Sequence, residues 1–366
     1  MPKAYKAIKD NLKLPKIIHI IGTNGKGSTG RFLAYILFKS GKSVGHYTSP
    51  HILKFNERVW INGKDIDDES LEKAHQKLLK ILPKKFQKSL SYFEYTTLLA
   101  MVAFENVEYA ILEAGLGGEF DATNVFDKEL SLITLIDFDH QSFLGENIKD
   151  IASTKIRSIQ KEAILGYQKY DEVKEVAKKI AENKNAKLYE IEEILTSDEI
   201  FAIKRFVKEK GLPSFFVDNF SLAATGAKKL SIELDLQKVK DIKIFGRMQK
   251  IAKNITIDVG HNKAAAKAIE KELKEKVVLV YNSYEDKDYE EILKILKPKI
   301  KKVEIIDIKD DRIVKKEILI DALKKLNIKY QDFKNIKKDE NYLIFGSFKV
   351  IETFLKLRSR TSNKKE

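Results

Sequence analysis

The sequence predicts an α/β protein with two doubly wound units, and three observations support this fold class. Short apolar runs rich in Ile and Val alternate with longer amphipathic segments, the pattern of buried parallel strands joined by helical crossovers. A chain of 366 residues is too long for one small core. A Gly-rich segment follows the first apolar run. We therefore expect a P-loop-containing parallel-sheet ATPase domain followed by a smaller Rossmann-like α/β domain.

The apolar runs that we interpret as strands lie in both halves of the chain. They are "KIIHII" (16–21), "YAILEA" (109–114), "LSLITLI" (130–136), "ITIDV" (255–259), "KVVLVY" (276–281), "KVEIIDI" (302–308) and "NYLIFGS" (341–347). From about 167 to 245 the pattern is weaker. There we expect strands near 200–207 and 213–217 and a helix near 219–229.

The linker between the two domains is expected near Gly246, where "IFGRMQK" precedes a fresh strand. This position gives a first domain at 1–246 and a second at 247–358. The last residues, 359–366, are polar and contain no apolar side chain, so they predict a disordered tail.

The composition excludes several classes of protein. Cysteine is absent, which rules out disulfides and thiolate metal sites and fits a cytoplasmic protein. No apolar run approaches the ~20 residues that a membrane span needs. The N-terminal segment "MPKAYKAIKD" has no apolar stretch of the kind found in secretory signals. We expect a cytoplasmic monomer with no membrane partner.

The net charge of +14 could indicate a nucleic-acid partner, since basic patches attract phosphate backbones. The lysines, however, are spread along the chain among Ile, Glu and Asp, as in "KELKEKVVLV" and "LKILKPKIKKVEI". We interpret most of them as solvated faces and expect no nucleic-acid partner. An excess of positive charge would also suit small polyanionic substrates.

The segment "GTNGKGST" (22–29) has the layout of a phosphate-binding loop between a strand and a helix. Its glycines permit backbone turns and let amide groups close on a phosphate. Lys26 can reach the terminal phosphates, and Ser28 or Thr29 offers a hydroxyl to a magnesium ion. The segment departs from the general P-loop pattern, because Ile20 replaces the first glycine and Gly27 stands where the hydroxyl should be.

The helix that follows this loop, from about 28 to 39, would present its positive N-terminal end to the same anion. Glu113 ends the apolar "YAIL" run and would lie beside the loop if the sheet is parallel. Among the histidines, His19 and His75 are interpreted as packing or surface residues. His140 and His261 follow strand ends, where an imidazole can meet a metal or a phosphate.

Six motifs carry a family resemblance. They are "GTNGKGST", "TSPHILKFNERVWING" (48–63), "FEYTT" (93–97), "LEAGLGGEFDATN" (112–124), "DFDHQSFLGENIKDIASTK" (137–155) and "DVGHN" (258–262). In order and approximate spacing they resemble the folylpolyglutamate synthase and dihydrofolate synthase family, part of the Mur ligase group of ATP-dependent amide-forming enzymes. The shortened loop of this chain resembles the Gly-x-x-Gly-Lys loop of the Mur ligase group. Gly27 followed by Ser28 resembles the Gly-Ser that the folate branch has after the lysine.

The resemblance implies a Mur ligase-like fold and an ATP-dependent ligase. It would join L-glutamate to dihydropteroate, to the glutamate chain of reduced folates, or to both, through an acyl phosphate. We expect a bifunctional enzyme. The implied cofactors are ATP and two Mg²⁺ ions, with a monovalent cation such as K⁺ as a further expected ion.

The resemblance also assigns residues to the nucleotide and the metals. The loop residues that would hold the ATP phosphates are Gly22, Thr23, Asn24, Gly25, Lys26, Gly27, Ser28 and Thr29. The residues that would ligate metal are Ser28, Ser49, Glu113, His140 and Lys155, the last at the place of a lysine that can be carbamylated. The residues of the second domain that would approach ATP, its ribose or its phosphates are Arg247, Asp258, His261 and Asn262.

The pterin would lie near "FNERVWING", "YFEYTT" and "FDATN". Phe93 and Phe120 are the candidates for packing on its ring, and Asp121, Thr123 and Asn124 for polar contacts. The catalytic set implied by the resemblance is Lys26, Glu113, His140, Lys155 and Arg247. Two departures stand out: "STKIRSI" lacks the family's acid before Lys155 and its Ala-Gly after it, and Gly260 replaces an alanine.

Two other functions remain open from the residues. A peptidoglycan Mur-type ligase would share the ATP apparatus, although, with the loop beginning at residue 22, we expect no added N-terminal nucleotide-sugar domain. A nucleic-acid-binding P-loop ATPase would use the positive charge and would show a steep salt dependence.

Overall fold

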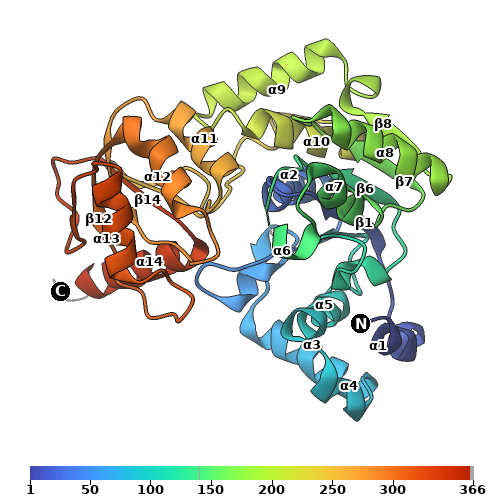
Figure 1. The fold of residues 1–366 in the computed structure, drawn as a ribbon. Helices are drawn as coiled ribbons and strands as arrows, with labels where there is room; N and C mark the ends of the chain where they lie inside the picture. The colour runs from blue at the N-terminus through green and yellow to red at the C-terminus, as the bar shows by residue number, and fades with distance from the viewer. Residues whose placement is uncertain (140, 363–366) are drawn as a thin grey trace. The chain divides into compact units, whose positions relative to one another are not determined.

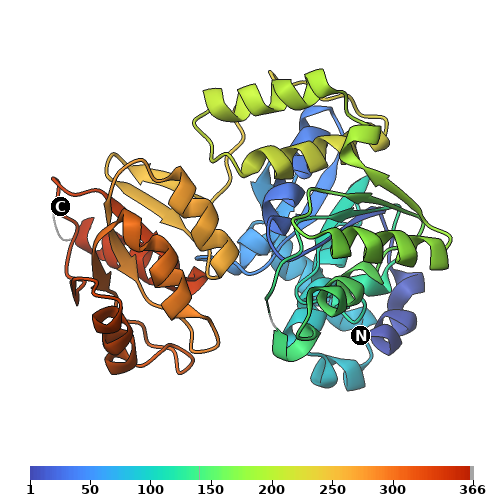
Figure 2. The ribbon, with the colours of Figure 1, turned by 45° about the horizontal axis from the view of Figure 1, so that its top comes forward.

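The structure is a computed structural model that describes residues 1–139 and 141–362. The chain forms two compact units, Met1–Ile242 and Lys243–Glu366. The boundary between them lies just before the predicted linker position at Gly246. Figures 1 and 2 show each unit as a sheet with helices packed against it. The prediction of two α/β units with mostly parallel sheets is confirmed.

In the described part of the chain, the first unit has an eight-stranded sheet of order β4-β3-β2-β5-β1-β6-β7-β8. Its strands are β1 (Lys16–Ile21), β2 (Val44–Tyr47), β3 (Val59–Ile61), β4 (Lys64–Asp65), β5 (Tyr109–Glu113), β6 (Leu130–Ile133), β7 (Glu162–Leu165) and β8 (Lys187–Glu190). β3 and β4 join antiparallel, and the other neighbours are parallel. The carboxyl ends of β1, β2, β5 and β6 therefore meet at one edge of the sheet.

Helices cover both faces of this sheet. They are α1 (Pro2–Ile8), α2 (Lys26–Lys39), α3 (Asp68–Ile81), α4 (Lys84–Ser89), α5 (Tyr92–Ala103), α6 (Gln141–Leu144), α7 (Ile148–Ile156), α8 (Asp171–Asn183), α9 (Ser197–Glu209) and α10 (Phe216–Lys229), with short 3₁₀ turns η1 (Lys9–Asn11), η2 (Phe55–Arg58), η3 (Ala122–Val125) and η4 (Ile191–Glu193). On one face α2 packs on α10, where the Phe32 ring lies 5.3 Å from Phe216 and 4.7 Å from Phe220. On the other face, α1, α3 and α5 bury Ile17 and Leu112 in one cluster, and α7 and α8 bury Ile133 in another.

The second unit has a six-stranded sheet of order β13-β12-β11-β14-β10-β9 within the described residues. Its elements are β9 (Gln249–Ala252), β10 (Ile255–Asp258), α11 (Lys263–Glu272), β11 (Val277–Tyr281), α12 (Tyr289–Leu296), η5 (Lys297–Lys299), β12 (Ile300–Ile305), α13 (Lys316–Lys325), β13 (Tyr330–Asp332), β14 (Tyr342–Phe345) and α14 (Phe348–Ser362). Only the β9–β10 pair is antiparallel among these pairings. The edge strands of both sheets are short, and β4 and β13 are exposed along their whole length.

Two predicted strands were wrong. The strands expected near 200–207 and 213–217 are instead α9 and the turn that enters α10. The buried residues of α9, Ile203, Phe206 and Val207, recur at helical spacing, and the Thr196 and Glu199 side chains form a capping box at its start. In the expected tail at 359–366, α14 continues to Ser362, so the first four residues of the tail are helical, and residues 363–366 lie outside the described residues.

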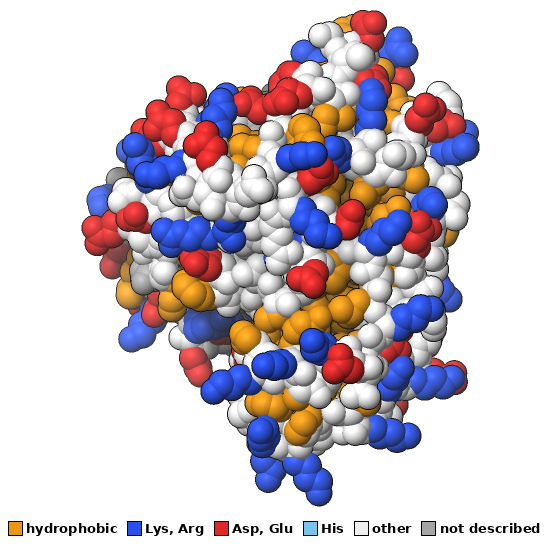
Figure 3. All heavy atoms as spheres, turned by 90° about the vertical axis from the view of Figure 1, so that its right-hand side faces the viewer, with side chains coloured by type: hydrophobic (Ala, Val, Ile, Leu, Met, Phe, Trp, Pro, Cys, Tyr) orange, Lys and Arg blue, Asp and Glu red, His pale blue; other side chains and the backbone are white. Residues whose placement is uncertain are grey.

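The surface supports the interpretation of the lysines as solvated faces. On the face seen in Figure 3, basic and acidic side chains are interspersed, and neither sign forms a continuous area. Exposed ion pairs within the first unit, such as Lys73 with Glu69 and Lys228 with Glu199, have this arrangement. No helix in residues 1–139 or 141–362 combines the length and the apolar character that a membrane crossing requires.

Candidate active site

The loop between β1 and α2 is fixed to the carboxyl end of β6. The backbone amides of Thr23 and Asn24 both donate to the Leu135 carbonyl, at 2.9 and 3.2 Å. Gly22 and Gly25 have φ of 139° and 89°, a region that favours glycine. α2 then begins at Lys26, and the amides of its first turn have no acceptor within the helix. These amides and the positive end of α2 are therefore available to an anion.

Two lysines converge on one carbonyl oxygen of this loop. Lys26 Nζ donates to Gly22 O at 3.1 Å and to Thr23 O at 3.3 Å, and Lys155 Nζ, from α7, donates to Gly22 O at 3.3 Å. Burial and the charge of Lys26 lower the pKa of Lys155 to about 7. A substantial part of the Lys155 amine is therefore neutral near pH 7. The structure brings these two predicted residues together.

Glu113 lies beside the same loop, at the end of β5. It pairs in parallel register with Ile20 of β1 and is 6% exposed. Its Oε2 accepts a short hydrogen bond from Thr48 Oγ1 and another from the backbone amide of Ser49 at 3.3 Å. A Cβ at Gly27 would lie 3.2 Å from both Glu113 Oε2 and Thr48 Oγ1. The glycine at position 27 thus allows this carboxylate to approach the start of α2.

The hydroxyls of the loop differ in position. Both Ser28 and Thr29 are buried, but the Thr29 Oγ1 atom is enclosed and has no hydrogen-bond partner among the described residues. Ser49 follows β2 and neighbours Glu113 through its backbone.

His140 lies outside the described residues. Within 1–139 and 141–362 there is no group of three or more His, Asp or Glu side chains arranged to hold a metal ion.

The polar residues predicted to contact a pterin lie in a segment that we name the 114–124 turn. Asp121 Oδ2 accepts from the Leu116 amide at 2.9 Å, and its Oδ1 accepts from the Thr123 amide and hydroxyl at 3.0 and 2.6 Å. Asn124 Nδ2 donates to the Glu119 carbonyl at 2.7 Å. These side chains therefore shape the turn through bonds within it.

The predicted aromatic residues occupy two different environments near this turn. Phe93 stacks on Tyr47 at 5.8 Å between ring centroids, and its ring would lie 2.7 Å from a Cβ at Gly115. Phe120 projects into solvent and is 87% exposed.

Arg58, which the sequence analysis did not single out, is buried, and its Nε donates to His51 Nδ1 at 2.8 Å. Its guanidinium also lies 5.4 Å from the ring centre of Tyr92.

A second residue that the sequence analysis missed is Asn219, in α10. A Cβ at Gly25 would lie 2.4 Å from Asn219 Oδ1, so this side chain lies directly against the loop between β1 and α2. The local pattern around Asn219 is only that of an amphipathic helix. No signal in one sequence connects it with a loop almost two hundred residues earlier.

The predicted residues of the second unit lie around the end of β10. Asp258 is buried, and its two carboxylate oxygens accept from the Met248 amide at 2.8 Å and the Gly260 amide at 2.7 Å. Asn262 caps α11 by accepting from the Ala265 amide at 2.9 Å. The Arg247 guanidinium lies 5.9 Å from the ring centre of Phe348. His261 Nδ1 lies 3.2 Å from the Val259 carbonyl.

Packing explains the glycine at position 260. A Cβ there would lie 2.7 Å from Ala265 Cβ and 2.9 Å from Asp258 Oδ1. This departure from the family pattern therefore belongs to the close approach of α11 to the end of β10.

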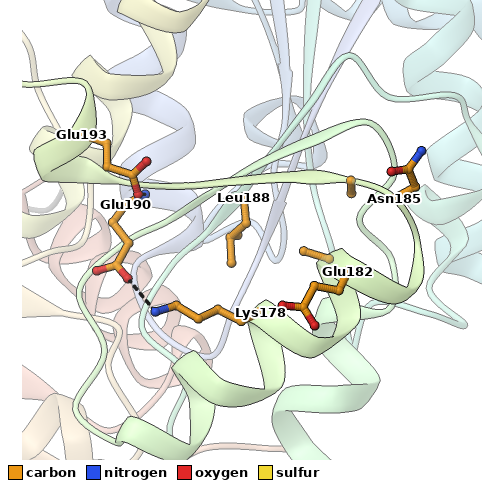
Figure 4. A pocket seen from close by; sticks show the side chains of 8 residues that line it. Lys178, Glu182, Asn185, Leu188, Glu190 and Glu193 are labelled. Atoms are coloured by element: carbon orange, nitrogen blue, oxygen red, sulfur yellow. Dashed lines mark hydrogen bonds and ion pairs between the residues drawn. The ribbon is translucent and has the colours of Figure 1, made fainter.

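A pocket of about 420 Å³ lies elsewhere in the first unit, between α8, β8 and η4. Figure 4 shows Lys178 extending to Glu190, at 3.7 Å, with Glu193 on the same side of the pocket and Glu182 and Asn185 on the opposite side. None of the predicted site residues lines this pocket.

Comparisons with known proteins extend over almost the whole chain. No family model matches it. The dihydrofolate synthase/folylpolyglutamate synthase of Buchnera aphidicola subsp. Schizaphis graminum is 32% identical, and the match covers 93% of this chain and 87% of that protein. The crystal structure of Helicobacter pylori folylpolyglutamate synthetase is 38% identical, with a TM-score of 0.80 over 98% of this chain and 93% of the other. Escherichia coli FolC in complex with DHPP and ADP is 23% identical, with a TM-score of 0.81 over 99% and 92%, and shares the fold.

Proposed function

The chain belongs to the folylpolyglutamate synthase/dihydrofolate synthase family, and from this premise we propose the substrates and the roles of its residues. It is an ATP-dependent ligase of that family. We propose that it joins L-glutamate both to dihydropteroate and to the glutamate chain of reduced folates. The observation that carries this proposal is the convergence of Lys26, Glu113 and Lys155 on one glycine-rich loop, in a chain that matches its relatives along most of its length.

The reaction would proceed in two steps. The γ-phosphoryl group of ATP passes to a carboxylate oxygen of the pterin substrate, which gives an acyl phosphate and ADP. The amine of L-glutamate then attacks the acyl carbon, the bond from that carbon to the phosphate oxygen breaks, and inorganic phosphate leaves as the amine loses a proton. Such transfer depends mainly on positioning and charge neutralisation, which the Lys26 ammonium and the first amides of α2 would supply.

A divalent metal fits the donor atoms at this edge of the sheet. Mg²⁺ prefers oxygen ligands, and the Glu113 carboxylate with the hydroxyls of Ser28 and Ser49 offers them beside the loop. These residues and Lys155 would hold the metal, which when bound neutralises phosphate charge and aligns the reacting oxygens. The second Mg²⁺, at His140, and the monovalent cation stay predictions.

Lys155 has the chemistry that carbamylation needs. Only a neutral amine attacks carbon dioxide, and the lowered pKa of Lys155 provides it near pH 7. The carbamate oxygens would then be further ligands for the metal. The test is ¹³C NMR of the protein in ¹³C-labelled bicarbonate: a carbamate signal that is present in the wild type and lost in Lys155→Met supports the proposal, and a signal absent from both contradicts it.

The pterin is proposed to lie against Phe93 and Phe120, with the Asp121 carboxylate as its polar contact. Phe120 is exposed and available, and Phe93 already packs on Gly115. Thr123 and Asn124 would act by shaping the 114–124 turn, because their polar groups bond within it and to His19 and Lys128. In the second unit, Arg247, Asp258, His261 and Asn262 remain proposed nucleotide residues, and their test is the KM for ATP of the alanine variants.

The deciding experiment measures phosphate release with ATP, Mg²⁺ and L-glutamate, in the presence of dihydropteroate or tetrahydrofolate. Release that requires glutamate and either pterin supports the bifunctional ligase. Release with only one pterin would restrict the activity to that substrate. Release that requires a peptidoglycan precursor or nucleic acid instead would favour one of the two alternative functions.

A further inference from the structure

The 114–124 turn is held from below by a buried chain of hydrogen bonds that begins at His19, in the middle of β1. His19 Nε2 lies 2.8 Å from Thr123 Oγ1, and Thr123 Oγ1 lies 2.6 Å from Asp121 Oδ1. His19 and Thr123 have no solvent-exposed surface. This series of hydrogen bonds therefore connects the central strand of the sheet with the Asp121 carboxylate, which accepts from the Leu116 amide.

The direction of these bonds follows from the number of protons. The Thr123 hydroxyl has one proton, and the ionised Asp121 can only accept it. Thr123 Oγ1 must therefore accept from His19 Nε2, so the ring carries its proton on Nε2. Burial and the charge of Lys128 hold the pKa of His19 well below its usual range, so the ring is neutral. His19 Nδ1 has no hydrogen-bond partner among the described residues, in agreement with that tautomer.

A second buried side chain holds the other end of the turn. Lys128 is 1% exposed, and its Nζ donates to Asn124 Oδ1 at 2.6 Å and to Asn124 O at 3.2 Å. Asn124 in turn donates to the Glu119 carbonyl. The segment between Leu116 and Glu119 is thus fixed at both ends by groups that lie below the sheet edge.

The turn also contacts the helix that carries Lys155. The Glu119 amide donates to the Thr154 carbonyl at 2.9 Å, and a Cβ at Gly118 would lie 2.3 Å from the Lys155 carbonyl oxygen. A shift of the turn would therefore displace both the exposed Phe120 and the backbone of α7.

We propose that His19 is a positioning residue for the pterin substrate, which acts through Thr123 to fix the Asp121 carboxylate and with it the 114–124 turn. This inference rests on the proposed function for its substrate. The hydrogen-bond chain itself does not depend on that function.

The test compares two buried histidines on opposite faces of the same sheet. His46, in β2, lies against α2 and Gly30, and neither of its ring nitrogens has a partner in the described part of the chain. His19→Leu removes the donor to Thr123, His46→Leu is the matched control, and His19→Gln restores an amide donor. Each variant is measured for its KM for pterin, its KM for ATP, and the hydrogen exchange of the Leu116 amide.

We expect His19→Leu to raise the KM for pterin and to speed exchange at Leu116 by about tenfold, the factor that a lost hydrogen bond of about 1.4 kcal/mol gives. The KM for ATP should stay within about twofold, and His19→Gln should return most of the loss. Equal effects in His46→Leu, or no rescue by His19→Gln, would overturn the proposal.

Two safeguards keep the test decisive. If His19→Leu does not fold, Thr123→Val breaks the same chain with little change of shape, and Thr123→Ser is its rescue; an unchanged KM and exchange rate in Thr123→Val would overturn the proposal. If the wild type shows no pterin-dependent turnover, the proposed function fails. The exchange rates at Leu116 then still show whether His19 holds the turn.

Discussion

The two glycine-rich segments that follow β1 and β5 lie at the same sheet edge but use their polar groups in opposite ways. In the loop at 22–29, the first amides of α2 have no acceptor within the helix, and the Lys26 ammonium donates to the Gly22 and Thr23 carbonyls of its own loop. In the 114–124 turn, Asp121, Thr123 and Asn124 bond to groups in and below the turn. The first segment leaves backbone amides available to an anion, whereas the polar side chains of the second hold the conformation of the turn.

This comparison predicts that substitutions in the first segment act mainly on the nucleotide, and substitutions in the second act on the pterin. The largest effect is expected for Lys26→Ala. Loss of the ammonium group should lower kcat by about a thousandfold or more, because it removes charge stabilisation at the transferred phosphate. The measurement is phosphate release under saturating substrates, with an unchanged unfolding midpoint as proof of folding. Lys73→Ala, at an exposed lysine of α3, is the control and should keep full activity.

Lys155, in α7, contacts both segments, because its amine donates to the Gly22 carbonyl and its own carbonyl lies against Gly118. Burial and the charge of Lys26 lower the pKa of Lys155 from its ordinary 10.5 to about 7 in the folded chain, so between these pH values the unfolded state binds the additional proton. The free energy of unfolding should therefore rise as pH increases from 7 to 10.5. It should fall again as pH decreases towards 7.

The comparison with Lys155→Met isolates this effect. Between pH 7 and 9, in buffer free of carbon dioxide, the free energy of unfolding of the wild type should rise by about 2 to 3 kcal/mol relative to the variant. Denaturant unfolding at three pH values measures it. Lys149→Met, at an exposed lysine of the same helix, should show no such difference. A flat difference for Lys155→Met would mean that its amine stays charged.

Asp121→Ala should distinguish the roles of the two segments most directly, through its effects on the KM for pterin and the KM for ATP. It removes the acceptor of three hydrogen bonds in the 114–124 turn, at a cost of about 2 kcal/mol. We expect the KM for pterin to rise by about thirtyfold while the KM for ATP changes little. Steady-state kinetics with each substrate varied in turn measures both. A parallel rise in the KM for ATP would show that the two segments are coupled and would break the comparison.

The smallest effect is expected for Gly27→Ala. The added Cβ would lie 3.2 Å from Glu113 Oε2 and Thr48 Oγ1, so the carboxylate must move by a few tenths of an ångström. We expect the Mg²⁺ concentration for half-maximal activity to rise by about three- to tenfold, since the carboxylate of Glu113, the proposed metal ligand, shifts. Gly41→Ala, where a Cβ would meet nothing within 4 Å, is a control for the substitution itself, although its φ of 85° adds local strain.

The sequence predicted what adjacent residues determine. The loop at 22–29 joins β1 to α2 in one contiguous stretch, so the strand, the turn and the helix could be predicted from that stretch. The long-range contacts could not, and Asn219 against Gly25 is the clearest example, because a single sequence does not show which helix covers the loop. The roles of Thr123 and Asn124 were hidden for a related reason: their partners, His19 and Lys128, come from other elements.

The error in α9 has a different origin. Its segment "IFAIKRFV" is rich in residues that favour strands, yet burial of Ile203, Phe206 and Val207 stabilises a helix. The capping box of Thr196 and Glu199 was visible in the sequence and points to the correct structure.

The edges of the two sheets have a consequence for the behaviour of the protein at high concentration. The edge strands in the described chain are β4, β8, β9 and β13. Each has no more than four residues and carries at least one charged side chain. The unpaired backbone groups of an exposed strand edge can pair with a strand of another molecule. Short edge strands with charged side chains offer few such groups. Together with the net charge of +14, they should keep concentrated solutions of the folded protein free of fibrillar aggregates, which light scattering over days of storage would measure.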